Sequence, residues 1–481
     1  MKRKPISKLF LYRYRFIIGY LLLGLSFIGL LFGLPLLAQT GLSQDEIESA
    51  TSSYFLGKDG VLNGDLVDLP YRILQKYSIM FLGLSAYSVK LPSMLVGLFL
   101  GLLLILLLNR WFKNNVSLLA SCLVILSTPF LFLSGSGTPL IMLVFWPTLL
   151  LWLGSKIQGE KRPRPIFTLL FAITMLASIF TPYMVYFAVF CIIFVLLQPH
   201  LRFILKDLPK LFLVVIAILM IGGVTVLGLN IANNTETLSK LLFASGFHSG
   251  DFFNNIGAGL ALAFSWHNSI ESVFLTPLIS MPILALALIG LLSTTKGFFA
   301  SRNSIATVLL VFCIIITGFN PDAIVSLMLP FSILIAHGLK YLLQKWYGLF
   351  PENPYARVFA LFPLTILFAI IIVPSLLQYI YGYRYTPNVA NQFSSSLEIV
   401  RKNLSDDYLV VGENYNFYKI LENSTNLKVV DKIDGLDSFA SLGKLDVPND
   451  NYDISKIITS PMSDNSDIIY IYTFTEKLEG E

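Results

Sequence analysis

Two adjacent acidic residues, Asp45 and Glu46, follow directly after the first long apolar run of this 481-residue chain. Ser43 stands three positions before Glu46, which is the capping-box pattern of a helix start. Glu46 therefore has a structural explanation as a capping residue, whereas Asp45 has none of this kind. A carboxylate at such a place can accept the proton of an incoming hydroxyl or amine, as a general base does. The positive end of the helix is expected to lower the pKa of Asp45 and keep it ionised.

A second polar group lies in the segment VDLPYRILQKYSIMFLG, which begins a predicted helix with Pro70 in its first turn. At helical spacing, one face of this segment is apolar and another is basic or amide-bearing. The apolar face holds Ile73, Leu74, Tyr77, Met80 and Phe81, and the other face holds Arg72, Gln75 and Lys76. The pattern predicts an amphipathic helix lying on a membrane surface. Arg72 and Lys76 would there bind a lipid phosphate or reach ordinary headgroups.

Other residues capable of chemistry are scattered. His248 and His267 share the segment 230–271 with Asp251, a pattern of low specificity for a metal or phosphate site. A divalent metal is the one cofactor that the sequence leaves open, with Glu46, His248 and His267 as its candidate ligands. Asp322 stands at the outer start of a predicted span, where an acidic residue favours a functional role.

The composition requires a membrane environment for these residues. The chain is 55% hydrophobic and 13% charged, with a mean hydropathy of +0.72, whereas charged residues form about a quarter of an ordinary soluble chain. A soluble enzyme and a disordered chain are both excluded. The sequence predicts an α-helical polytopic membrane protein.

About eleven runs are long enough to cross roughly 30 Å of hydrocarbon. The predicted spans are 16–38, 91–108, 116–133, 138–154, 166–181, 183–198, 211–229, 272–292, 304–318, 323–343 and 358–380. The basic start before the first span resembles a signal peptide, but the length of the run and the lack of a cleavage site favour an uncleaved anchor.

Lys and Arg collect in every second loop, which predicts a cytoplasmic N-terminus and an extracytoplasmic C-terminus. The predicted membrane domain covers 1–385 and includes the outer loop 39–90. The polar tail 386–481 has apolar runs at 409–411, 429–430 and 468–472. This rhythm predicts a small extracytoplasmic α/β module.

The acidic pair after the first span, the loop with Pro70, and the sequence LGLSAYSVKLPSMLVG leading into the second span carry a resemblance. With the late span LMLPFSILIAHGLKYLL and the soluble outer tail, the chain resembles the GT-C glycosyltransferases, in the group of protein mannosyltransferases, aminoarabinose transferases and RgtA/B/C/D-like enzymes. The resemblance implies transfer of a sugar from a polyprenyl-phosphate donor to an extracytoplasmic glycan, lipid or protein acceptor, in a single inverting displacement. It also implies that the chain lies in a plasma (cytoplasmic) membrane.

By position, the resemblance implies that Asp45 is the catalytic carboxylate and Glu46 its neighbouring support or a metal ligand. Donor phosphate binding is expected from Arg72, Lys76, Lys90 and Tyr183. Lys90 stands where the family usually has Arg, and Tyr183 stands in a region where a Lys is common. The segment SGSGTPLIM after the third span lacks the acidic residue often found there.

Two alternatives stay open at this stage. A transporter or flippase for a lipid-linked or anionic solute would have charges inside several spans and matched halves, and the sequence has neither. A non-catalytic membrane scaffold would use its outer tail to bind a partner. A Gly-rich phosphate loop is missing from the tail, and nothing in the sequence predicts a nucleic-acid partner.

Overall fold

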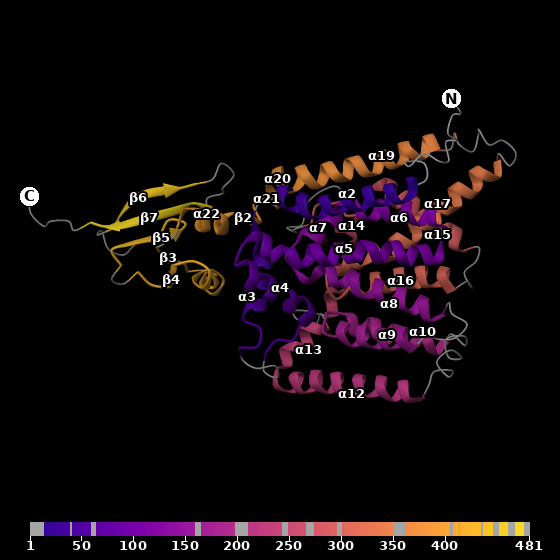
Figure 1. Cartoon of the computed structure of the whole chain (residues 1–481), viewed down its shortest axis with the longest axis horizontal. Helices are drawn as coiled ribbons and strands as arrows, with labels where there is room; N and C mark the ends of the chain where they lie inside the picture. The colour runs from indigo at the N-terminus through magenta and orange to yellow at the C-terminus, as the bar shows by residue number, and fades with distance from the viewer. Residues whose placement is uncertain are drawn as a thin grey trace, which may run out of the picture.

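The computed structural model describes residues 14–38, 41–58, 64–158, 165–197, 210–242, 249–265, 274–295, 301–349, 359, 361–404, 407–412, 414–433, 436–445, 452–459 and 467–475. Most helices run roughly along the long axis of the molecule, and a small sheet stands beyond one end of them (Figure 1). The short helices α3 and α4 lie at that same end. The fold therefore has a helical body and a separate β-rich module.

Five helical stretches in the described part are long and apolar enough to cross a membrane. They are α5 (Ala86–Trp111), Pro139–Ile157 in η2 (Pro139–Ile141) and α8 (Met142–Gln158), Val214–Asn233 in α12 (Lys210–Asn233), Pro321–Leu349 in η4 (Pro321–Leu327) and α17 (Met328–Leu349), and Phe362–Tyr385 in α19 (Leu361–Leu377), η5 (Gln378–Gly382) and α20 (Tyr383–Tyr385). A sixth stretch joins α6 (Asn114–Ile125) and α7 (Thr128–Gly135), which are bent by 64°. Pro129 in the first turn of α7 removes a helical N–H at this bend.

Shorter apolar helices complete the body: α2 (Arg15–Ala38, apolar over Gly24–Pro35), α9 (Pro165–Ser178), α10 (Met184–Leu197), α14 (Phe252–Phe264), α15 (Met281–Thr295) and α16 (Ser301–Thr317). The predicted spans overlap these apolar helices, with two differences: the span 116–133 is divided between α6 and α7, and the span 272–292 corresponds to α15, which begins only at Met281. The chain is an integral membrane protein with a helical fold, as its composition predicts.

The predicted spans 166–181 and 183–198 are two separate helices in the structure. α9 ends at Ser178 and α10 begins at Met184. Tyr183 between them has a φ of 56°, and its N–H donates to the carbonyl of Leu241 in α13 (Thr235–Leu241) at 2.9 Å. The segment 230–271, predicted as an outer loop, contains α13 and α14. Its apolar stretch IGAGLALAF is too short to have been recognised as a span by length.

The outer loop contains a two-residue strand and two helices. β1 (Leu42–Ser43) leads into α3 (Gln44–Tyr54), and α4 (Leu69–Leu82) has Pro70 in its first turn. Gln75 of α4 is fully buried, and its amide donates to the carbonyls of Val89 and Gly137 at 3.1 and 2.8 Å. Its carbonyl oxygen accepts hydrogen bonds from Ser49 and Ser53 of α3. One side chain therefore holds α3, α4, α5 and the 134–138 turn together.

The tail forms the predicted α/β module. Its five-stranded sheet has the order β4-β3-β5-β7-β6, from β3 (Tyr408–Val410), β4 (Lys428–Val430), β5 (Ser438–Leu442), β6 (Tyr452–Ile458) and β7 (Ile469–Phe474). β3 pairs in parallel with β4 and β5, and β7 pairs antiparallel with β5 and β6. The three apolar runs of the sequence are β3, β4 and β7. β5 and β6 were not predicted from the sequence, because β5 is rich in Ser and Ala and most of β6 is exposed.

The start of the tail joins the module to the outer loop. β2 (Phe393–Ser394) pairs antiparallel with β1, and α22 (Ser396–Asn403) follows it. The buried carboxylate of Asp467 accepts hydrogen bonds from Ser394 Oγ at 2.6 Å and from Ser395 N at 3.0 Å. Apolar residues of both parts form one core that includes Leu42, Ile47, Leu84, Leu397, Val400 and Leu421. The outer loop and the tail are therefore packed as one unit above the spans.

Candidate active site

A polar cavity of about 170 Å³ lies where the outer loop, the ends of several spans and the start of the tail meet. Its lining comes from five separate stretches of sequence: Ser43, Asp45 and Glu46; Phe132, Ser136, Thr138 and Leu140; Phe274; Asp322; and Gln392 and Phe393. The charged residues among them are all acidic. The cavity is therefore suited to an uncharged or positively charged group at its centre.

Asp45 lies in the first turn of α3, where it is exposed and also lines this cavity. Partial burial raises the pKa of Asp45 above its ordinary value, and the negative charge of Glu48 raises it further. The prediction that the helix N-terminus lowers this pKa is therefore wrong. Desolvation and a like charge outweigh the helix dipole at this position. A carboxylate with a raised pKa is a stronger base than an ordinary aspartate.

Glu46 has the opposite environment, because its side chain is only 1% exposed. The predicted capping box is present: Ser43 Oγ accepts from Glu46 N, and Glu46 Oε2 accepts from Ser43 N at 2.9 Å. Glu46 Oε1 also accepts a hydrogen bond from Gly137 N. Lys90 Nζ lies 3.8 Å from Glu46 Oε2 and donates to the Gly41 carbonyl at 2.8 Å. These contacts make Glu46 a support for the site.

The turn 134–138 depends on the absence of a side chain at Gly137. A Cβ on Gly137 would lie 2.7 Å from Val89 Cγ1 and 3.2 Å from the Val89 carbonyl oxygen. Because of this close approach, the N–H of Gly137 reaches Glu46 and its carbonyl reaches Gln75. This segment thus positions the outer loop through its backbone.

Asp322 lines the same cavity as Asp45. It lies in the first turn of η4, where Asn320 caps the helix by accepting the Asp322 N–H at 2.9 Å. The charges of Asp45 and Asp322 interact across the cavity. The sequence placed Asp322 at the outer start of a span, and the structure adds that it shares a cavity with Asp45. No local pattern could have given that pairing, because 277 positions separate the two residues.

The four predicted phosphate ligands have separate sets of contacts. Arg72 pairs with Asp65 at 3.1 Å, and Lys76 Nζ donates to the Leu56 carbonyl at 2.7 Å. Tyr183 is 1% exposed and donates from its hydroxyl to the Leu143 carbonyl at 2.6 Å. Among these four residues, Lys90 forms an ion pair with an acid that lines the cavity, Glu46. The structure does not bring the four together at one point, and their role in binding phosphate stays a prediction.

The candidate metal ligands His248 and His267 lie outside the described residues. Within the described ranges, no group of three or more His, Cys, Asp and Glu side chains could hold a metal ion. Both oxygens of Glu46 already accept backbone N–H groups, and Lys90 lies beside one of them. This donor set does not fit a divalent cation.

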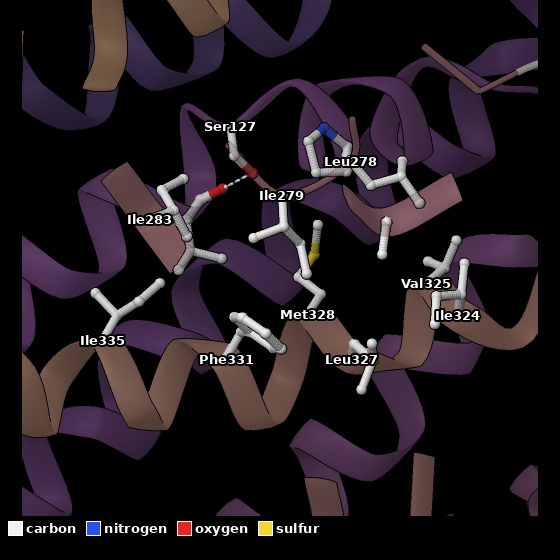
Figure 2. A pocket seen from close by; sticks show the side chains of 13 residues that line it. Ser127, Leu278, Ile279, Ile283, Ile324, Val325, Leu327, Met328, Phe331 and Ile335 are labelled. Carbon is white, nitrogen blue, oxygen red and sulfur yellow. Dashed lines mark hydrogen bonds between the residues drawn. The ribbon is translucent and has the colours of Figure 1, made fainter. Parts of the chain in front are cut away.

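A second pocket is apolar, and Figure 2 shows its side chains. Its volume is about 50 Å³, and α6, α7, α14, α15, η4 and α17 contribute to it. Ser127 is among the lining residues, but its hydroxyl donates to the Val124 carbonyl at 2.6 Å. η4 lines both spaces, with Asp322 in the polar cavity and Ile324 and Val325 in the apolar pocket. The same short helix therefore contributes an acidic side chain to one space and apolar side chains to the other.

The arrangement of spans, outer loop and tail is that of the GT-C glycosyltransferase fold, and the expected resemblance is confirmed at the level of the fold. The chain is similar to ArnT from Cupriavidus metallidurans bound to undecaprenyl phosphate, with a TM-score of 0.51, 12% identity, and coverage of 96% of this chain and 99% of that one. It is also similar to the oligosaccharyltransferase AglB from Archaeoglobus fulgidus in complex with an inhibitory peptide and a dolichol-phosphate, with a TM-score of 0.51 and 12% identity. That likeness covers 87% of this chain and 65% of AglB. No protein-family model and no curated protein sequence matches this chain.

The Glu46–Lys90 pair generates a stability prediction. Replacing Glu46 by Gln removes the negative charge 3.8 Å from the buried ammonium of Lys90 and leaves one backbone N–H without its carboxylate acceptor. Breaking a buried pair of this kind costs about 3 to 5 kcal/mol. The midpoint of thermal unfolding in detergent, followed by intrinsic fluorescence, is expected to fall by several degrees. Glu48→Gln, an exposed change on the same helix, should leave it nearly unchanged. Equal midpoints for Glu46→Gln and Glu48→Gln would contradict the supporting role of Glu46.

Proposed function

We propose that this chain is a membrane glycosyltransferase that moves a sugar from a polyprenyl-phosphate donor to an acceptor on the extracytoplasmic side. The observation that carries the proposal is Asp45, a carboxylate open to a polar cavity at the outer end of a GT-C fold. No hydrogen bond to its side chain is found in the described residues, whereas the neighbouring Glu46 is fully engaged. The fold and this unengaged carboxylate favour a transferase over a transporter or a scaffold.

The chemistry needs one base. Asp45 accepts the proton of the acceptor hydroxyl or amine while the acceptor atom attacks the anomeric carbon of the sugar. The bond between that carbon and the phosphate oxygen breaks, and the polyprenyl phosphate leaves with the electron pair. Phosphate is a good leaving group, so a carboxylate suffices as the base. Attack opposite to the leaving group inverts the anomeric configuration, as in inverting glycosidases.

Asp322 is proposed as the residue that orients the acceptor. It lines the same cavity as Asp45, and together the two carboxylates can accept two hydrogen bonds from one amine, or one each from two hydroxyls of the same acceptor. Two acidic side chains also repel a carboxylate or phosphate placed between them. The reacting end of the acceptor, whether on a glycan, a lipid or a protein, is therefore neutral or cationic.

The donor is proposed to bind with its isoprenoid chain against the apolar pocket and its phosphate near cationic side chains. Arg384 is a further candidate for the phosphate, besides Arg72, Lys76, Lys90 and Tyr183. Its Nε atom is buried and has no hydrogen-bond partner in the described part of the chain. It follows Tyr383, whose ring stacks at 5.2 Å on Phe132 of the cavity wall. The ArnT structure, which contains undecaprenyl phosphate, supports a donor of this class.

Substitution of Asp45 tests the proposal. Purified protein is supplied with a panel of labelled polyprenyl-phosphate sugars and a membrane extract as the source of acceptors. Wild type is expected to transfer label, and Asp45→Asn is expected to be slower by about 10² to 10⁴-fold, since it loses the base. Glu48→Gln serves as the matched control and should remain active at neutral pH. The proposal is wrong if wild type uses no donor, or if Asp45→Asn equals wild type.

The raised pKa of Asp45 predicts a pH effect on the same reaction. Asp45 acts in its ionised form, so kcat/KM falls on acidification through its pKa, which lies above the roughly 3.9 of a free aspartate. Glu48→Gln removes a negative charge that raises this pKa, so the acidic limb of the profile should move to lower pH. Profiles of kcat/KM against pH for the two proteins measure the shift. An unmoved limb, or one moved to higher pH, argues against Asp45 as the titrating base.

A further inference from the structure

A second, basic recess lies between the tail module and the start of α5. It has a volume of about 280 Å³ and is lined by Ser85, Leu397, Glu398, Arg401 and Lys402. Arg401 and Lys402 are exposed, and no ion pair to either is found in the described part of the chain. The charge of Glu398 also acts on Lys90. The recess therefore carries more positive than negative charge.

The neighbouring surface is apolar. The exposed face of α4 holds Ile73, Leu74, Tyr77, Met80, Phe81 and Leu82, and Phe81 is 82% exposed. The rings of Tyr77 and Phe81 are stacked with their centroids 6.1 Å apart. An exposed apolar face of this size on an amphipathic helix is typical of contact with a lipid surface. This is the same face that the sequence predicted to lie on the membrane.

Chain connectivity sets the level of the recess relative to the membrane. α4 ends at Leu82, and Gly83 and Leu84 lead directly to Ser85, which lines the recess. The membrane-spanning helix α5 begins at the next residue, Ala86. The predicted span within α5 begins at residue 91, so the recess at Ser85 lies about 9 Å before it along the helix, which is within the level of phospholipid headgroups.

We propose that this recess binds the phosphate headgroup of an anionic phospholipid, while the exposed face of α4 contacts the acyl chains. The guanidinium of Arg401 can donate two parallel hydrogen bonds to a phosphate, and Lys402 adds a second positive charge. α22 carries both cations and packs through Leu397 and Val400 into the core that contains Leu84 and Ala86. A bound headgroup would hold the tail module on the membrane, next to the loop that carries Asp45.

Hydrogen–deuterium exchange on the full-length protein in lipid nanodiscs tests this proposal. Wild type is compared in phosphatidylcholine alone and in phosphatidylcholine mixed with phosphatidylglycerol. The expected result is slower exchange over 396–403 when phosphatidylglycerol is present. Arg401→Gln/Lys402→Gln should lose this lipid-dependent protection. Lys444→Gln/Lys456→Gln, an exposed pair elsewhere on the module, should keep it. Glu398→Gln removes the acidic residue of the recess and should increase the protection.

Three results would overturn the proposal: equal exchange in the two lipid compositions, protection that survives in Arg401→Gln/Lys402→Gln, or loss of protection in the Lys444→Gln/Lys456→Gln control. A separate arm adds inorganic phosphate to protein in a neutral detergent. The same protection in that arm would assign the recess to a free anion and reject a lipid headgroup. None of these measurements involves sugar transfer, so their outcome is independent of the proposed enzymatic function.

Discussion

The arrangement of the outer loop, α5 and the turn at Gly137 depends on the contacts of one buried carboxylate, that of Glu46. It accepts hydrogen bonds from Ser43 N and Gly137 N and lies 3.8 Å from Lys90 Nζ. These groups belong to the outer loop, to the turn before η2 and to α5. Ser43 also lies in β1, which pairs with β2 of the tail. A charge buried in this way is costly unless hydrogen bonds and an opposite charge surround it, so these segments must stay in register.

The consequence for the site follows from helix geometry. Neighbouring residues in a helix point in directions about 100° apart. Both side chains line the polar cavity, but Glu46 is held toward Ser43 and the turn at Gly137 by hydrogen bonds, whereas Asp45 points in another direction and no hydrogen bond to it is found in the described residues. The two adjacent acids carry the same charge but differ in their contacts, and they therefore have different roles. Gln75 adds a second, uncharged connection between the same helices and the same turn.

Much of this could be predicted from local sequence. The apolar runs gave the helices of the body, the Ser43–Glu46 spacing gave the capping box, and the three apolar runs of the tail gave β3, β4 and β7. The rest depends on contacts between residues far apart in the chain. The pairing of Lys90 with Glu46, the approach of Asp322 to Asp45 and the direction of the Asp45 pKa shift all arise from packing that no short pattern encodes. α14 was missed because Asn and Gly interrupt a stretch too short for a typical span.

The central claim is that a single carboxylate, Asp45, activates the acceptor for direct displacement of a polyprenyl phosphate. The anomeric configuration of the sugar in the product, determined by NMR and compared with that in the donor, tests this claim most directly. A single displacement predicts complete inversion. Retention would require a covalent sugar–enzyme intermediate and a nucleophilic carboxylate, and it would contradict the account of Asp45 as a base.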